Sequence, residues 1–284
     1  MNNYLMAATL AEALEFLDKG NSRVIAGGTD LFIDLNEGKT NSTSFVDISN
    51  IKELEQISES EEFLEVGSCC IFSEIEKNPL VLKFAPSLAK AASEVGSPQI
   101  RNTGTIGGNI VNAMPAADGA TALMGLKAKV EVVSKSGNRE VSLEDCYVGI
   151  GKSVIDPTRE IITKILIPKC GPNRKAVFKR MALRKSLALP VVACSVLLEF
   201  NGNIIKDLHV VAAPAGTRPW YDTDIESKAI DKKLSAELLN SICEEAAAKA
   251  PFRDSPSRCS AKYKHLLAEA LLKDCVADIL KEVR

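Results

Sequence analysis

Two glycine-rich segments, far apart in the sequence, contain the residue types best suited to binding an anion. The first, residues 24–31, reads Val-Ile-Ala-Gly-Gly-Thr-Asp-Leu. An apolar run ends there in a glycine pair, and the missing side chains let backbone amides approach a bound anion. Thr29 adds a hydroxyl donor, and Asp30 could cap a following helix or accept a hydrogen bond from a sugar hydroxyl. Taken alone, the segment is more typical of an ordinary tight turn.

The second segment, residues 96–109, reads Gly-Ser-Pro-Gln-Ile-Arg-Asn-Thr-Gly-Thr-Ile-Gly-Gly-Asn, and Pro-Ala-Ala-Asp follows at residues 115–118. A loop this long is seldom a simple connection. Its amides, hydroxyls and second glycine pair are suited to a pyrophosphate, whereas a purely structural loop is the alternative. Together the two segments predict a nucleotide-binding site.

Two common nucleotide motifs do not fit the sequence. Neither glycine-rich segment has the Gly-x-Gly-x-x-Gly pattern and later acidic residue of a Rossmann fold. Residues 151–153, Gly-Lys-Ser, resemble the end of a phosphate-binding loop, but that loop requires glycine at position 146, which is Cys146. The sequence therefore argues against a Rossmann site and against NTP hydrolysis.

The eight cysteines and two histidines are too scattered for a metal site. No Cys-x-x-Cys pair occurs, and His209 and His265 have no partner at the spacing of metal ligands. Zinc and iron–sulfur sites need closely spaced thiolates or imidazoles. We therefore expect no metal in this chain and cysteines that are mostly small buried apolar residues.

The charge balance and hydropathy exclude other classes of protein. The 284 residues include 35 Lys and Arg against 37 Asp and Glu, which gives a formal charge of −2. A chain that binds nucleic acid would have an excess of basic residues, and these residues would be clustered. No apolar run reaches the roughly 18 residues that span a bilayer, and the first residues lack the features of a signal peptide. We expect a cytoplasmic protein with neither nucleic acid nor membrane as a partner.

Apolar periodicity predicts the elements that must position the two segments. A capping box at Thr9–Glu12 starts a helix that Gly20 ends, and a short strand over 23–26 leads into the first glycine pair. Asn201-Gly202 predicts a hairpin, and the proline-containing segment 168–175 predicts a linker. The other expected strands are 45–48, 129–134, 161–167, 191–200 and 204–211, and the other expected helices are 84–95, about 119–126, 235–249 and one opening at 260–264. This order predicts a mixed α/β domain followed by an antiparallel sheet with helices, an α+β fold.

The residues at 26–31 (Ala-Gly-Gly-Thr-Asp-Leu), 96–109 and 115–118 resemble the FAD-binding subunit of molybdenum hydroxylases. This family includes xanthine dehydrogenase, carbon monoxide dehydrogenase and nicotinate dehydrogenase. The resemblance covers essentially the whole chain and includes Pro-x-x-Asp at 251–254 and Ser-Ala-Lys-Tyr-Lys at 260–264. It implies an FAD-binding domain of the vanillyl-alcohol-oxidase type, with two α/β subdomains, over residues 1–168. A C-terminal flavoprotein domain of antiparallel sheet and helices would follow over residues 172–284.

The resemblance also implies a set of FAD-binding residues. The first segment would hold the pyrophosphate and ribityl region, the second would cradle the diphosphate, and Asp118 would bind adenosine or ribityl hydroxyls. Ile162 would contact the adenine end, and Arg180 would lie near the flavin ring. The implied residues are Val24, Ile25, Ala26, Gly27, Gly28, Thr29, Asp30, Leu31, Gly96, Thr105, Ile106, Gly107, Gly108, Asn109, Asp118, Ile162 and Arg180.

The sequence departs from the family's ring-side pattern of Tyr-x-Lys-x-x-x-Arg. The matching residues are Phe178, Arg180 and Arg184, so a tyrosine hydroxyl is missing and an arginine replaces the lysine. Arginine keeps the positive charge but presents it as a rigid fork. Met114 also stands where many relatives have a small polar residue.

The resemblance implies an electron-transfer subunit without catalytic side chains of its own, since flavin carries the redox step. It would take electrons from two-iron iron–sulfur clusters in a small partner subunit and pass them to NAD+ or another acceptor. A large partner subunit would hold molybdopterin and the organic substrate, which could be xanthine, another purine, nicotinate or another heterocycle. The alternatives are a self-contained flavin oxidoreductase of the same fold and a scaffold that has lost FAD.

Overall fold

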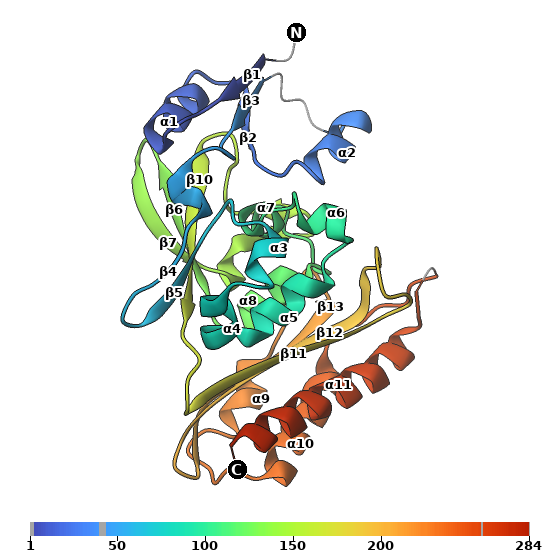
Figure 1. The fold of residues 1–284 in the computed structure, drawn as a ribbon. Helices are drawn as coiled ribbons and strands as arrows, with labels where there is room; N and C mark the ends of the chain where they lie inside the picture. The colour runs from blue at the N-terminus through green and yellow to red at the C-terminus, as the bar shows by residue number, and fades with distance from the viewer. Residues whose placement is uncertain (1–2, 40–43, 257, 284) are drawn as a thin grey trace.

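The N-terminal part of the chain forms a small parallel sheet beside two helices (Figure 1). The structure is a computed structural model that describes residues 3–39, 44–256 and 258–283. The sheet has the order β1-β3-β2, and its strands are β1 (Asn3–Met6), β2 (Ser22–Ile25) and β3 (Ser44–Asp47). The helix α1 (Leu10–Asp18) begins at the predicted cap, where Thr9 Oγ1 accepts from the Glu12 amide at 3.2 Å, whereas the Glu12 carboxylate accepts from the Ala8 amide at 2.7 Å and not from that of Thr9. The helix α2 (Leu31–Asn36) buries none of its residues and stands apart from the sheet.

A five-stranded antiparallel sheet forms the second layer, with order β4-β5-β10-β6-β7. Its strands are β4 (Ile57–Glu59), β5 (Phe63–Gly67), β6 (Lys129–Ser134), β7 (Gly137–Ser142) and β10 (Glu160–Pro168). The central strand, β10, is apolar along most of its length because it is covered on both faces. The segment between β5 and β6 forms the helices α3 (Phe72–Ile75), α4 (Pro79–Phe84), α5 (Pro86–Glu94), α6 (Pro98–Arg101), α7 (Ile106–Val111) and α8 (Asp118–Gly125). Short elements complete this part: η1 (Lys52–Glu55), η2 (Glu144–Cys146), β8 (Tyr147–Gly149) and β9 (Lys152–Ser153).

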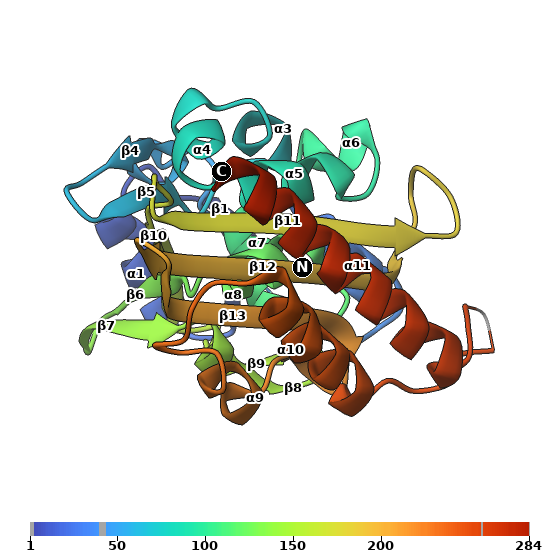
Figure 2. The ribbon, with the colours of Figure 1, turned by 90° about the horizontal axis from the view of Figure 1, so that it is seen from below.

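The C-terminal part is an antiparallel sheet with helices on one face. Its strands follow the chain order: β11 (Arg174–Ala182), β12 (Pro190–Asn201), β13 (Ile204–Ala215) and β14 (Arg218–Trp220). Three helices follow: α9 (Thr223–Ser227), α10 (Ala236–Lys249) and α11 (Ala261–Glu282). Figure 2 shows α10 and α11 crossing the same face of this sheet. The other face packs against α5 and α8.

Alternation along β12 divides the C-terminal core into two sides, because successive side chains of a strand point to opposite faces. Ala193 and Leu197 join the apolar cluster that includes α5 and α8. Cys194 and Val196 join the cluster that includes α10 and α11. Among the described residues, no helix is long and apolar enough to cross a membrane.

The α+β class and the order of the two parts are as expected, but several predicted bounds are wrong. The helix expected over 84–95 begins at Pro86, because Ala85 separates it from α4 with an extended φ of −144°. The glycine-rich segment expected to be a loop contains α6 and α7. The hairpin forms, but Asn201 pairs with Ile204 and only Gly202 has a positive φ, so the turn lies one residue later than expected.

Candidate functional site

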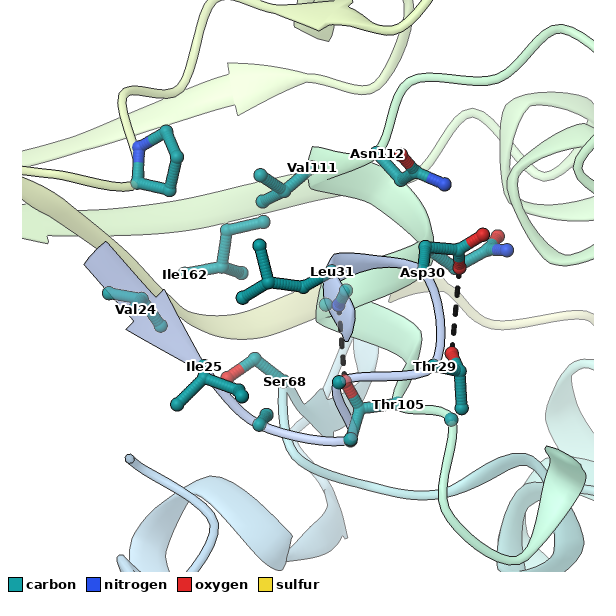
Figure 3. Close-up of a pocket in the computed structure, with 18 of the residues that line it drawn as sticks. Val24, Ile25, Thr29, Asp30, Leu31, Ser68, Thr105, Val111, Asn112 and Ile162 are labelled. Carbon is teal, nitrogen blue, oxygen red and sulfur yellow. Dashed lines mark hydrogen bonds between the residues drawn. The ribbon is translucent and has the colours of Figure 1, made fainter. Parts of the chain in front are cut away.

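A pocket lies where the two glycine-rich segments meet, between β2, β10 and α7 (Figure 3). It encloses about 1040 Å³ of space free of protein atoms, including the part open to solvent. Segments far apart in the sequence therefore form one cavity, as the two motifs predict.

The first segment supplies backbone donors to this pocket. The strand β2 ends at Ile25, and the chain then passes through Gly28, whose φ of +66° favours glycine. Within the described parts of the chain, the amides of residues 27–30 have no hydrogen-bond acceptor. A Cβ at Gly27 would lie 2.1 Å from the Thr103 carbonyl oxygen. Glycine is thus required there so that the two segments can touch each other.

The second segment has fewer free donors than its sequence suggests. Thr105 caps α7, and its hydroxyl accepts from the Gly108 amide at 3.2 Å. The amides of Ile106 and Gly107 donate to Cys70 O at 3.0 Å and to Ser68 O at 2.9 Å, and the Asn109 amide donates to Thr105 O at 3.1 Å. We therefore place the free amide donors on residues 27–30 rather than on residues 106–109.

The side chains divide the pocket into an apolar and a polar part. Val24, Leu31, Val111 and Ile162 face one another in the apolar part, as Figure 3 shows. Thr29, Asp30 and Asn112 lie together on the polar side. The pKa of Asp30 is raised by partial burial and by the nearby Asp34, whereas hydrogen bonds from Thr29 and Asn112 oppose this rise.

Most of the predicted residues line the pocket. They are Val24, Ile25, Ala26, Gly27, Gly28, Thr29, Asp30, Leu31, Thr105, Gly107, Gly108, Asn109 and Ile162. Four predicted residues lie outside the lining. Ile106 is fully buried in the core, and Gly96 accepts a hydrogen bond from the Leu187 amide at 3.0 Å. The other two, Asp118 and Arg180, bind each other.

Arg180 connects two carboxylates outside the pocket lining. Its Nη1 donates to Asp118, its Nε donates to Glu94 at 3.2 Å, and its side chain is 4% exposed. Burial raises the pKa of Asp118 to about 7, the Arg180 guanidinium opposes this rise, and Glu94 adds to it. One Asp118 oxygen, Oδ1, is buried without a hydrogen-bond partner in the described structure. The Arg180 charge is therefore held by protein carboxylates.

Phe178 and Met114, which depart from the family pattern, and Arg184, which matches it, all lie outside the pocket lining. Phe178 is 2% exposed and belongs to the apolar cluster between the C-terminal sheet and α5 and α8. Arg184 is exposed and donates to the carbonyl groups of Ser186 and Leu187. Met114 is also exposed.

Sequence reasoning missed several residues of the pocket. Val111 and Asn112 lie two and three residues after the second segment and could have been included by extending it along α7. Ser68 and Phe72 come from the segment after β5, which carries no recognisable motif. They reach the pocket because β5 pairs with β10 and brings Gly67 opposite Lys164.

The cysteines and histidines have structural surroundings. Seven of the eight cysteines are buried as free thiols, as expected, and Cys259 is half-buried. His209, for which the sequence offers no partner, lies 3.0 Å from Glu226, and both side chains are buried. No group of metal-binding side chains occurs in the described part of the chain.

Known proteins resemble the chain over almost its full length. Residues 1–170 match the family described as "FAD binding domain in molybdopterin dehydrogenase", and residues 176–279 match "CO dehydrogenase flavoprotein C-terminal domain". The chain is 30% identical over 267 residues to the nicotinate dehydrogenase FAD-subunit of Eubacterium barkeri, covering 92% of this chain and 88% of that protein. It is 28% identical over 278 residues to a putative xanthine dehydrogenase FAD-binding subunit of Escherichia coli (strain K12), covering 97% and 95%. The fold is similar to a chain of carbon monoxide dehydrogenase from Hydrogenophaga pseudoflava, with a TM-score of 0.90 at 20% identity, covering 99% of this chain and 97% of that chain.

Proposed function

Because the chain belongs to the family of FAD-binding subunits of molybdenum hydroxylases, we propose that the pocket between β2, β10 and α7 holds FAD. The observation that carries the proposal is the row of free amides at residues 27–30 in a pocket that both glycine-rich segments line. A diphosphate is an anion that needs several hydrogen-bond donors, and backbone amides meet that need without a charged side chain. Gly108 adds room, because a Cβ there would meet only its capping Thr105 hydroxyl within 4 Å.

The two parts of the pocket suit the two ends of a dinucleotide. Ile25, Ile161 and Ile162 are almost fully buried and give the apolar part a closed wall. Adenine takes no part in redox chemistry and can occupy this closed part. The flavin ring must exchange electrons, so we place it toward the exposed side, where Asp30 and Asn112 lie. The implied roles of Asp118 and Arg180 remain part of the proposal. For Asp118, the Oδ1 atom is the acceptor that a hydroxyl of FAD would use, because it has no partner in the described structure.

In this proposal the chain binds and orients the cofactor and supplies no acid or base of its own. The amides of residues 27–30 hold the diphosphate, and the aliphatic side chains exclude water from the adenine end. Bound FAD supplies the capacity to accept electrons singly and release them as a pair. Electrons would arrive from the iron–sulfur clusters of a small partner subunit and leave to NAD+ or another acceptor.

The organic substrate would be bound by a large molybdopterin-containing partner subunit. The similar proteins are named for nicotinate and for xanthine. A chain whose task is to hold FAD could serve either kind of partner. We therefore propose a heterocycle as the substrate of the complete enzyme, with xanthine or nicotinate as the first compounds to assay.

Titration of the purified chain with FAD, followed by visible absorbance and flavin fluorescence, tests the proposal. We expect a yellow protein, and we expect Gly108→Val to weaken FAD binding at least about tenfold by filling the pocket, a loss of about 1.4 kcal/mol. Gly171→Val is the matched control, because a Cβ at Gly171 meets nothing within 4 Å and Gly171 lies outside the pocket. A chain that is indifferent to FAD would contradict the proposal. Turnover of an organic substrate by the isolated chain would instead indicate a self-contained flavin oxidoreductase.

A further inference from the structure

Ser68 places a buried, unpartnered hydroxyl in the wall of the pocket. The residue directly follows β5, is 4% exposed and lines the pocket. Its Oγ makes no hydrogen bond to an oxygen or nitrogen atom of the described residues. An unpaired buried hydroxyl costs about 1–3 kcal/mol, so a position that retains one calls for an explanation.

The main chain of Ser68 is held on both sides. Its amide donates to Thr163 O at 3.0 Å, and its carbonyl accepts from the Gly107 amide at 2.9 Å. A Cβ at Gly107 would lie 2.8 Å from the Ser68 Cβ, so the glycine allows α7 to pack directly on this residue. These two hydrogen bonds fix the Ser68 main chain at the pocket wall, so the hydroxyl can change position only by rotation about the Cα–Cβ bond.

The surroundings offer the hydroxyl only a weak acceptor. The neighbouring Cys69 thiol donates its proton to Ile48 O at 3.5 Å. A contact from the Ser68 side chain to this thiol lowers the thiol's pKa slightly against the rise caused by burial, but sulfur is a poor hydrogen-bond acceptor. In Figure 3, Ser68 lies beside Ile25 at the apolar part of the pocket, away from Thr29 and Asp30. A hydroxyl set among aliphatic side chains can select a ligand group that carries a polar atom on a flat apolar body.

We propose that Ser68 binds the adenosine half of FAD, with its hydroxyl hydrogen-bonded to a ring nitrogen or a ribose hydroxyl. This inference rests on the proposed function, because it requires FAD in the pocket. It adds a binding residue that neither glycine-rich motif contains. It also predicts that the chain distinguishes adenine-containing ligands from a flavin mononucleotide through this residue.

The test compares Ser68→Ala with Ser87→Ala. Ser87 is 2% exposed, and its Oγ is also buried without a partner in the described structure, but it lies in α5 outside the pocket. Kd values are measured for FAD, ADP and FMN. We expect Ser68→Ala to raise the Kd of FAD and of ADP about five- to tenfold, the value of one hydrogen bond, and to leave the Kd of FMN unchanged. Ser87→Ala should change none of the three.

Thermal unfolding without ligand separates binding from stability. Ser68→Ala removes an unpaired hydroxyl, so its Tm should equal or exceed that of the wild type. If this variant does not fold, Ser68→Cys keeps the size with only a weak donor and should show the same pattern of Kd values. A Kd for FAD within twofold of the wild type, or equal losses for ADP and FMN, would overturn the role of Ser68. A wild-type chain that binds none of the three ligands would overturn the proposed function itself.

Discussion

Burial and pairing act in opposite directions on Asp118. The Arg180 guanidinium favours the charged carboxylate, but loss of solvent around a 6% exposed residue outweighs it and raises the pKa from 3.8 to about 7. Glu94 contributes by sharing the same arginine and repelling the second charge. In the unfolded chain the carboxylate ionises near its ordinary value. Between about pH 4 and pH 7, the Asp118 carboxyl therefore keeps its proton in the folded protein but has lost it in the unfolded chain.

This difference predicts how stability changes with pH in the FAD-free chain. Because the folded pKa is raised, the contribution of Asp118 is greatest below pH 4 and is lost as the pH rises to about 7. The loss approaches about 1.4 kcal/mol per pH unit within this window. In urea unfolding between pH 4 and pH 8, Asp118→Asn should therefore lose less stability with rising pH than the wild type. Asp207→Asn changes a surface partner of Lys127 and should keep the wild-type slope; parallel curves for all three proteins would contradict the assignment.

Local signals predict the elements that local chemistry stabilises. The helix α10 begins after Ser235, whose hydroxyl accepts from the Leu238 amide at 3.2 Å, and it ends at Lys249 as the sequence predicts. The helix α7 was missed because two glycines have poor helix propensity, and its start depends on the Thr105 cap and on packing against Ser68. The site is likewise predictable only where local patterns reveal it. The glycine motifs identify the two loops that line the pocket, whereas Ser68 is brought to the pocket by the pairing of β5 with β10, which no local pattern shows.

The dependence of α7 on its cap gives a prediction for this element. Thr105 is 5% exposed, and its hydroxyl satisfies the Gly108 amide. Thr105→Val keeps the shape but removes the acceptor, so it should lower the free energy of unfolding by about 1–2 kcal/mol. Thr105→Ser retains the hydroxyl and should recover most of the capping contribution. Both values are measured by urea unfolding without FAD, and a valine variant as stable as the wild type would show that the cap contributes nothing.

Residues 1–170 and residues 176–279, which match two different family domains, contribute to one shared apolar cluster. Leu123 and Met124 of α8 belong to the same cluster as Phe178, Leu197 and Val211 of the C-terminal sheet. A Cβ at Gly125 would lie 2.1 Å from the Ser195 hydroxyl, so the helix packs directly on β12. The domain bounds expected from the sequence, 1–168 and 172–284, stay a prediction. In the structure, α8 of the first domain packs directly on the sheet of the second.

The shared core predicts a single cooperative unfolding transition. The chain has one tryptophan, Trp220 in β14, which reports on the C-terminal sheet, whereas far-UV circular dichroism reports on helices of both parts. If neither part is stable without the other, the two signals must change at the same urea concentration. Gly125→Ala forces a methyl group into the contact between α8 and β12 and should cost about 1–3 kcal/mol, moving both curves together. Two separate transitions, or a shift in only one signal, would show that each part folds without the other and that the contact between them forms only after both have folded.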